Sequence, residues 1–284
     1  MSCRFTDEFE KQISALGIEK GSNVLISSDL SAMLFAAVRD GSVNLKAGKV
    51  AQDKFLNDFI ECLQHLVGSS GTLLVPAFTW EYCKGIPFDI KKSPSKVGSL
   101  GNWIIKNRPD FLRTKHALYS FMVWGANQDY LVSLENRDSF SEDSPFGFLH
   151  RNRGYSLGIN ISLPNSFTFI HYVEECIKVP YRYLKEFKGE YTDKSGVTTE
   201  RIYSMFVRDL ALKHHLLLNK DFFIETGALK EHFWNHQHIL LMDLAECFEF
   251  SKRDLLSNNG SNIVSFDNYV LNWEKGPTHS DHLV

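Results

Sequence analysis

Two short apolar runs separated by two helical patterns constrain the fold of this chain more than any other feature. The runs are residues 24–27 and 72–75, each bounded by Ser, Asn, Gly or Pro. Residues 30–38 predict a helix and residues 39–52 a polar loop. The next segment is apolar at helical spacing, at Phe55, Phe59, Leu63 and Leu66. Since parallel strands need a long crossover connection, this order predicts two parallel strands in one sheet.

The rest of the chain predicts more elements of both kinds, with a change of pattern near residue 190. Thr6 can cap a first helix, and Ser144 followed by Pro can start a later one. Asp193–Gly196 is a turn signal between two extended runs, which predicts an antiparallel hairpin. We expect one domain over residues 1–284, with a hairpin-containing C-terminal part from about residue 190 and a polar tail from about residue 259.

Charge and composition disfavour several classes of protein. The chain has 31 basic and 34 acidic residues and a net charge of −3 without a charged block, so we expect neither nucleic acid nor a membrane as a partner. No apolar run approaches the roughly 20 residues that span a bilayer, and the first residues lack the apolar core of a signal peptide. The five cysteines form no CxxC pair, which fits a reducing compartment. We therefore expect a cytoplasmic location.

The sharpest candidate for chemistry is a histidine and a glutamate three residues apart, His171 and Glu174. They follow Ser166, the expected cap of a helix, and lie beside Ile170 and Val173, which would face the core. A histidine oriented by a carboxylate inside a cleft can act as a general base. The spacing alone equally describes a His–Glu pair on a helix surface.

Two further segments have the composition of an anion site. The first is Ser27, Ser28, Asp29 and Leu30. It leads a strand into a helix, whose N-terminal N–H groups suit a pyrophosphate, although ordinary capping by Ser28 or Asp29 explains it as well. The second is the loop at residues 88–98, which carries Ser93 and Ser95 among lysines. Phosphate binding and a solvated loop both remain open for it.

Other chemistries find little support in the sequence. There is no GxxxxGK[ST], GxGxxG or GxSxG motif. Cys176 follows His171 by five residues and would lie on another face of a helix, which makes a poor nucleophile pair. His236 and His238 have no recognisable third ligand, so we expect no metal.

The segments from about residue 20 to at least residue 190 together resemble the aminoglycoside 3-N-acetyltransferase family. The opening strand and turn of that family are matched by ISSDL at residues 26–30. Its Gly-Thr-Leu strand is matched by GTLLVPAFT at residues 71–79. Its Phe-Asp and Ser-Pro-Ser loop is matched within residues 88–98.

Three later motifs continue the resemblance in the same order. The segment RTKHALYSF occupies residues 113–121, and the helix start SEDSP occupies residues 141–145. The Thr-x-x-His-x-x-Glu helix is matched by Thr168, His171 and Glu174. Order and spacing, more than any single motif, make the resemblance specific.

The resemblance implies an α/β/α sandwich with a central mixed sheet, unlike the fold of the histone-type acetyltransferases. It implies acetyl-CoA as co-substrate, an amine on a sugar-like ring as acceptor, His171 as the general base and Glu174 as its support. The predicted contacts to acetyl-CoA are Ser27, Ser28, Asp29, Leu30, Thr79, Ser93, Ser95 and Ser120. The predicted contacts to the acceptor are His116, Asp143, Arg182 and Tyr183.

We expect direct transfer in a ternary complex, because no activated Cys or Ser is evident. Thr79 and Ser120 lie at the ends of strands and are candidates to polarise the thioester carbonyl. Antibiotic resistance, an acyl donor other than acetyl-CoA, a non-catalytic CoA- or sugar-binding role and a homo-oligomer all stay open at this point.

The chain departs from the family pattern at positions near the acceptor. Ser27 stands where many members have His, Ala117 where they have Pro, and Glu142-Asp143 where they have Gly. The segment 178–190 is rich in basic residues. It favours an anionic acceptor, such as a nucleotide-linked amino sugar, over a polycationic aminoglycoside. Glu142 and Asp143 favour a cation instead.

Overall fold

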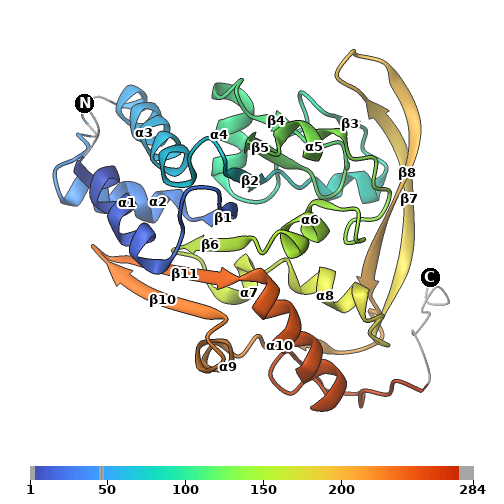
Figure 1. Cartoon of the computed structure of the whole chain (residues 1–284). Helices are drawn as coiled ribbons and strands as arrows, with labels where there is room; N and C mark the ends of the chain where they lie inside the picture. Colours follow the sequence, from blue (N-terminus) through green and yellow to red (C-terminus); the bar gives the residue numbers. More distant parts are fainter. Residues whose placement is uncertain (1–3, 45, 47, 275–284) are drawn as a thin grey trace.

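The computed structural model of the chain describes residues 4–44, 46 and 48–274, and has a seven-stranded sheet at its centre (Figure 1). In spatial order the strands are β10 (Leu229–Trp234), β11 (Gln237–Asp243), β6 (Tyr155–Ile159), β1 (Asn23–Ser28), β2 (Thr72–Pro76), β5 (Phe121–Gly125) and β4 (Leu112–Arg113). Strand β1 pairs in parallel with β2 and with β6, whereas the other neighbours are antiparallel. The predicted parallel pairing and the mixed sheet are therefore confirmed.

Helices cover both faces of this sheet. One face packs against α1 (Arg4–Leu16), α2 (Leu30–Arg39), α3 (Lys49–Val67) and α4 (Ser99–Asn107). The other packs against α5 (Gln128–Ser133), α6 (Pro145–Arg151), α7 (Leu163–Ser166), α8 (Ile170–Cys176), α9 (Lys220–Glu225) and α10 (Leu244–Ser257). In β1, Val24 and Ile26 enter the first core and Leu25 the second, as the two-residue period of a strand requires. The result is the expected α/β/α sandwich.

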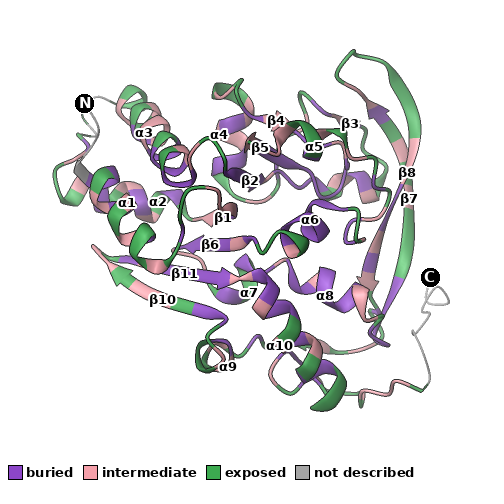
Figure 2. Ribbon diagram, viewed as in Figure 1, coloured by how far each residue is buried: buried purple, intermediate pink, exposed green. Residues whose placement is uncertain are grey.

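A long hairpin stands at one side of this sandwich (Figure 1, gold). It consists of β7 (Arg182–Thr192) and β8 (Thr198–Arg208), with β3 (Phe88–Asp89) beside β7. Much of its length is exposed (Figure 2). The predicted hairpin is confirmed, but it begins at residue 182 and not near 190, because charged residues on its exposed face hide the strand pattern. Strands β9 (His214–Leu216) and β12 (Val264–Phe266) form a separate antiparallel pair.

Three predicted helix starts can be compared with the structure. Ser144 caps α6 as predicted, since its hydroxyl accepts from the amide of Gly147. Thr6 is not a cap, because it lies inside α1. Ser166 is not the cap of the helix that carries His171. It ends α7, and its hydroxyl donates to the carbonyl of Leu163.

Two further findings concern the ends and the membrane. Within residues 4–274, leaving out positions 45 and 47, none of the helices has the length and apolar character that a membrane span requires. The predicted polar tail contains β12, and residues 275–284 lie outside the described part of the chain.

Candidate active site

The first turn of α8 holds the predicted His–Glu pair in contact. His171 Nδ1 lies 2.7 Å from Glu174 Oε2, with the histidine side chain 24% exposed and the glutamate side chain fully buried. The hydrogen-bond network assigns the ring proton to Nδ1, because that nitrogen faces a carboxylate. This tautomer leaves Nε2 as the basic nitrogen.

The carboxylate of Glu174 is held by two further side chains. The Tyr181 hydroxyl donates to Oε1 at 2.9 Å, and Arg182 Nε lies 2.8 Å from Oε2. Burial alone would raise the pKa of Glu174, but Arg182, His171 and Tyr181 lower it to about 2. The group is therefore an anion at neutral pH. Arg182, predicted to contact the acceptor, serves first as the counter-ion of Glu174.

Burial also decides the charge of His171. It lowers the pKa of the ring, the positive charge of Arg182 lowers it further, and Glu174 opposes both effects. The net pKa lies below the ordinary value for histidine, so the ring is neutral at neutral pH. A neutral imidazole with a free Nε2 is in the form that a general base requires.

Two cavities meet at His171. We call the first the strand-end cavity, because it lies where β1 and β2 end; its volume is about 260 Å³. We call the second the hairpin cavity, because residues of β7 and β8 line much of it; its volume is about 540 Å³. His171 and Tyr119 line both cavities. A group that moves between molecules bound in the two cavities would pass these side chains.

The strand-end cavity presents unused hydrogen-bonding groups. Ser27 and Ser28 line it, and the Ser28 hydroxyl is buried with no hydrogen-bond partner in the described chain. Asp29 instead caps α2: its side chain accepts hydrogen bonds from two amides at the start of the helix. This is the ordinary capping role that the sequence left open. Gly98, with φ of 66°, is the N-cap of helix α4, and no side chain caps this helix start. At Gly101 a Cβ would lie 2.4 Å from the carbonyl of Pro76, so glycine lets this helix start approach the end of β2.

Three other residues predicted to bind acetyl-CoA lie outside the strand-end cavity. Ser93 accepts a hydrogen bond from the amide of Asp89, and the Ser95 hydroxyl donates to the carbonyl of Val97 at 2.7 Å. Leu30 lines a different groove, between α2, α3 and α4. The two serine hydroxyls thus order their own loop, and their contact with a cofactor stays a prediction that the geometry does not favour.

Thr79 and Ser120 are also engaged within the protein. Both accept hydrogen bonds from the buried Arg113 guanidinium, and Ser120 donates to the carbonyl of Ala77 at 2.8 Å. Neither residue lines either cavity in the described chain. A role of either hydroxyl in polarising a carbonyl stays a prediction that this geometry does not favour.

The predicted acceptor contacts divide in the same way. Tyr183 and Arg182 line the hairpin cavity, but His116 and Asp143 line neither cavity in the described chain. His116 is buried, which lowers its pKa to about 3, and its Nδ1 accepts from the amide of Tyr119 at 3.1 Å. Asp143 accepts from the Ser141 hydroxyl. His116 therefore positions Tyr119, and its contact with a substrate stays a prediction that the geometry does not favour.

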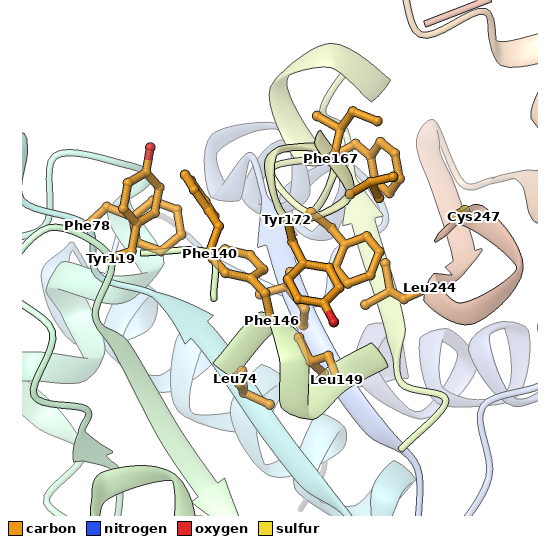
Figure 3. Packing of buried hydrophobic residues seen from close by; sticks show 14 of the residues in the cluster. Leu74, Phe78, Tyr119, Phe140, Phe146, Leu149, Phe167, Tyr172, Leu244 and Cys247 are labelled. Carbon is orange, nitrogen blue, oxygen red and sulfur yellow. The ribbon is translucent and has the colours of Figure 1, made fainter. Parts of the chain in front are cut away.

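Tyr119 is the residue that sequence reasoning missed. Its ring centroid lies 4.6 Å from that of Phe78 and 4.7 Å from that of Phe140, and its hydroxyl points away from the core residue Phe146 (Figure 3). Burial raises the pKa of this hydroxyl to about 12, and a hydrogen bond with the Trp80 side chain opposes the shift. The residue stood inside the motif at residues 113–121, but only its place at both cavities singles it out.

One of the two histidines considered as metal ligands, His238, makes another contact. His238 Nε2 lies 2.6 Å from Glu231 Oε1. Among the residues that the structure describes, no group of three or more His, Cys, Asp or Glu side chains is placed to hold a metal ion.

Comparison with known proteins agrees with this arrangement. The model of the aminoglycoside 3-N-acetyltransferase family matches residues 43–255. The SPbeta prophage-derived aminoglycoside N(3')-acetyltransferase-like protein YokD of Bacillus subtilis (strain 168) is 22% identical, over 92% of this chain and 95% of its own length.

Two solved structures share the fold. AAC-IIIb in binary complex with CoASH has a TM-score of 0.69 and 19% identity, over 89% of this chain and 96% of its own. Sisomicin-bound AAC-VIa has a TM-score of 0.68 and 18% identity, over 89% and 98% of the two chains. With a family model matched over most of its length, the chain belongs to the aminoglycoside 3-N-acetyltransferase family.

Proposed function

We propose that this protein transfers the acetyl group of acetyl-CoA to the amine of an amino sugar or aminoglycoside-like acceptor. The observation that carries the proposal is the place of His171, which lines both cavities and keeps Nε2 free while Glu174 holds Nδ1. Such a base can serve an acceptor on one side and an acyl donor on the other in a single ternary complex.

The strand-end cavity is the proposed place of the donor. Amides at the uncapped start of α4 and the unpartnered hydroxyl of Ser28 are donors for a pyrophosphate. They meet at the carboxyl ends of parallel strands, where α/β proteins commonly bind nucleotides. The CoASH complex of AAC-IIIb, which shares the fold, supports this choice.

The hairpin cavity is the proposed place of the acceptor. Its volume of about 540 Å³ is sufficient for a sugar-like ring with substituents. The sisomicin complex of AAC-VIa supports an amine acceptor of the aminoglycoside type. The basic segment after α8 led us to favour a nucleotide-linked amino sugar, and we keep that molecule as the acceptor candidate.

The residues present can carry out the transfer without a covalent enzyme intermediate. His171 Nε2 takes a proton from the acceptor ammonium, and the free amine attacks the thioester carbonyl. A C–N bond forms, the attacking nitrogen releases its second proton to solvent, the C–S bond breaks, and the proton held on Nε2 passes to the departing thiolate, so that CoA leaves as the thiol. Glu174 fixes the tautomer and stabilises the charged ring. General-base catalysis of this kind contributes about 10²–10⁴-fold.

Tyr119 takes the role first considered for Thr79 and Ser120. Its hydroxyl accepts from the Trp80 side chain, which leaves its own proton available to donate. Since Tyr119 lines both cavities beside His171, we propose that it stabilises the negative charge that develops on the thioester oxygen.

Release of CoA in the presence of different acyl-CoA donors and amine acceptors tests the proposal. We expect turnover with acetyl-CoA, and a loss of about 10² or more in turnover for His171→Ala with acetyl-CoA affinity unchanged by calorimetry. Binding of CoA without turnover on any amine would support the non-catalytic alternative. Faster release from a longer acyl-CoA would support a different donor. Absence of CoA binding at millimolar concentration would contradict the proposed function.

A further inference from the structure

We infer that the hairpin cavity selects an acceptor that carries a phosphate or carboxylate group, and that Arg208 and Lys185 bind this anion. The inference rests on the proposed function, in which this cavity holds the acceptor. It assigns a binding role to Lys185, which lies in the basic segment 178–190, and to Arg208, which none of the sequence motifs includes. It also reverses the charge preference expected for an acceptor of the aminoglycoside type, which is a polycation.

Cationic side chains dominate the polar lining of this cavity. They are Arg182, Lys185 and Arg208, and no carboxylate of the described chain lines it. Arg182 is neutralised by Glu174, which lies 2.8 Å away. Lys185 and Arg208 are exposed, and neither forms an ion pair in the described part of the chain. Two positive charges at the cavity are thus free for a ligand.

The pairing of the hairpin strands gives a further reason why Arg208 needs a counter-charge. Arg208 lies directly opposite Arg182 in the β7–β8 ladder. Like charges at opposed positions destabilise a sheet. Among the described residues the pair has one counter-ion, the carboxylate of Glu174, and Arg182 binds it. A guanidinium can bind a phosphate or carboxylate through two parallel hydrogen bonds, so an anionic ligand at Arg208 would supply the missing counter-charge.

His214 adds an unpartnered polar atom to the same lining. Its Nε2 is buried and has no hydrogen-bond partner in the described chain, and its ring stacks on Tyr181 with the centroids 5.4 Å apart. Burial lowers the pKa of His214 to about 4, so the ring is neutral at neutral pH. A buried ring nitrogen left without a partner is costly unless a ligand or water satisfies it, which is a second reason to place a polar group here.

The carboxylates nearest to His171 do not reverse this charge. Glu174 is fully buried and paired with Arg182. Glu175 is buried, burial together with Asp138 raises its pKa, and it does not line the cavity. Asp143, which the sequence suggested as a contact for a cationic acceptor, does not line the cavity.

The remaining lining is apolar and aromatic, and includes Phe140, Tyr183, Phe187 and Met205. Such a surface suits a ring or an aliphatic body, not a ligand with charges on every side. The combination describes an acceptor with one amine for His171, an apolar or aromatic body, and an anionic group at Arg208 and Lys185. A polycation would place ammonium groups beside uncompensated guanidinium and ammonium groups, which costs binding energy.

Calorimetry with acceptors that share one amine tests this inference on the full chain with CoA present. The probes are glucosamine, glucosamine 6-phosphate, muramic acid, UDP-glucosamine and gentamicin. At least one anionic probe should bind about tenfold or more tightly than glucosamine, with a difference that shrinks as salt is added. Comparison of the four amino sugars separates a phosphate, a carboxylate and a nucleotide as the source of the charge.

Two variants assign the effect to the named residues. Arg208→Gln should remove about tenfold or more of the affinity for the anionic probe, Lys185→Gln should remove less, and neither should alter glucosamine binding. Lys188→Gln is the matched control. Lys188 lies on β7, the same strand as Lys185, but it pairs with Glu200 and does not line the cavity. Unchanged CoA binding in each variant shows that the fold is intact.

Tighter binding of gentamicin than of every anionic probe would overturn the inference. So would an anion preference that Arg208→Gln leaves unchanged. Because binding is measured without turnover, a protein that fails to acetylate can still show the predicted selectivity. Acetylation of gentamicin in preference to the anionic amines would overturn this inference alone and leave the proposed reaction standing.

Discussion

The two cavities at His171 are lined by different kinds of structure. The strand-end cavity is walled by the ends of β1 and β2 and the start of α4, and Ser28, Gly98 and Gly101 are among its lining residues. The hairpin cavity is walled by long side chains on β7 and β8. Backbone groups depend little on residue type, whereas side chains change with each substitution. The comparison suggests that donor recognition follows from the fold and acceptor recognition from this particular sequence.

The largest effect should come from Glu174, which holds His171 for both cavities. Glu174→Gln leaves the buried guanidinium of Arg182 without its counter-ion, so we expect a loss of about 3–5 kcal/mol in the free energy of unfolding. Urea unfolding measures it. Turnover should fall less than in His171→Ala, because Gln can still accept from Nδ1.

The double variant Glu174→Gln with Arg182→Met is the control for this expectation. It removes the unpaired charge together with its partner, and should recover part of the lost stability. A single Glu174→Gln variant as stable as the unchanged protein would show that Arg182 finds another partner, and that the network around His171 is less coupled than its distances indicate.

The same contrast explains what the sequence could predict. The strand-end side depends on local patterns: the runs that become β1 and β2, the helix starts after them, and the His–Glu spacing. Each of these patterns lies within about ten residues of sequence, and each predicted feature is present in the structure. Ser28 and Asp29 were both considered as caps, and the structure gives that role to Asp29.

The hairpin side depends on contacts that local patterns do not contain. Arg182 meets Glu174 through a turn and meets Arg208 across a hairpin. His214 belongs to none of the motifs that the sequence analysis singled out. In the same way, Thr79 and Ser120 looked available because their partner, the guanidinium of Arg113, is brought to them only by the fold.

A smaller effect, confined to catalysis, should follow the loss of one hydroxyl shared by the two cavities. Tyr119→Phe keeps the ring between Phe78 and Phe140 and removes only the oxygen. We expect turnover to fall by about 10², with affinity for CoA and for the acceptor little changed. Tyr130→Phe serves as the control, since that residue is exposed and lines neither cavity. Equal turnover for both variants would remove Tyr119 from the mechanism.

The next largest expected effect concerns the strand-end cavity alone. The Ser28 hydroxyl has no partner within the described chain, so Ser28→Ala breaks no internal hydrogen bond and should leave the melting temperature unchanged. If the hydroxyl meets the donor, KM for acetyl-CoA should rise about two- to tenfold, which corresponds to one neutral hydrogen bond of about 0.5–1.5 kcal/mol. KM for the acceptor should not move.

Ser95→Ala is the matched comparison for Ser28→Ala. Its hydroxyl donates to the Val97 carbonyl, so its loss should lower stability and leave KM for acetyl-CoA nearly unchanged. The opposite assignment, with KM sensitive to Ser95 and insensitive to Ser28, would move the donor's phosphates from the strand ends to the loop at residues 88–98.

The smallest expected effect is the change in turnover with pH. It tests whether burial and Arg182, or Glu174, set the charge of His171. Burial and Arg182, on the hairpin side, lower the pKa of the ring below 6.5, whereas Glu174 raises it. NMR titration of the ring protons, assigned with His171→Asn, should therefore give a midpoint below 6.5. Turnover at saturating acceptor should change by less than about twofold between pH 7.5 and 6.5, because the base is already neutral. The unfolded chain binds this proton near pH 6.5, so the stability that the neutral ring contributes is full above that pH and is lost as the pH falls toward the folded pKa. A midpoint above 6.5 would mean that Glu174 outweighs burial and Arg182 in setting the charge of His171.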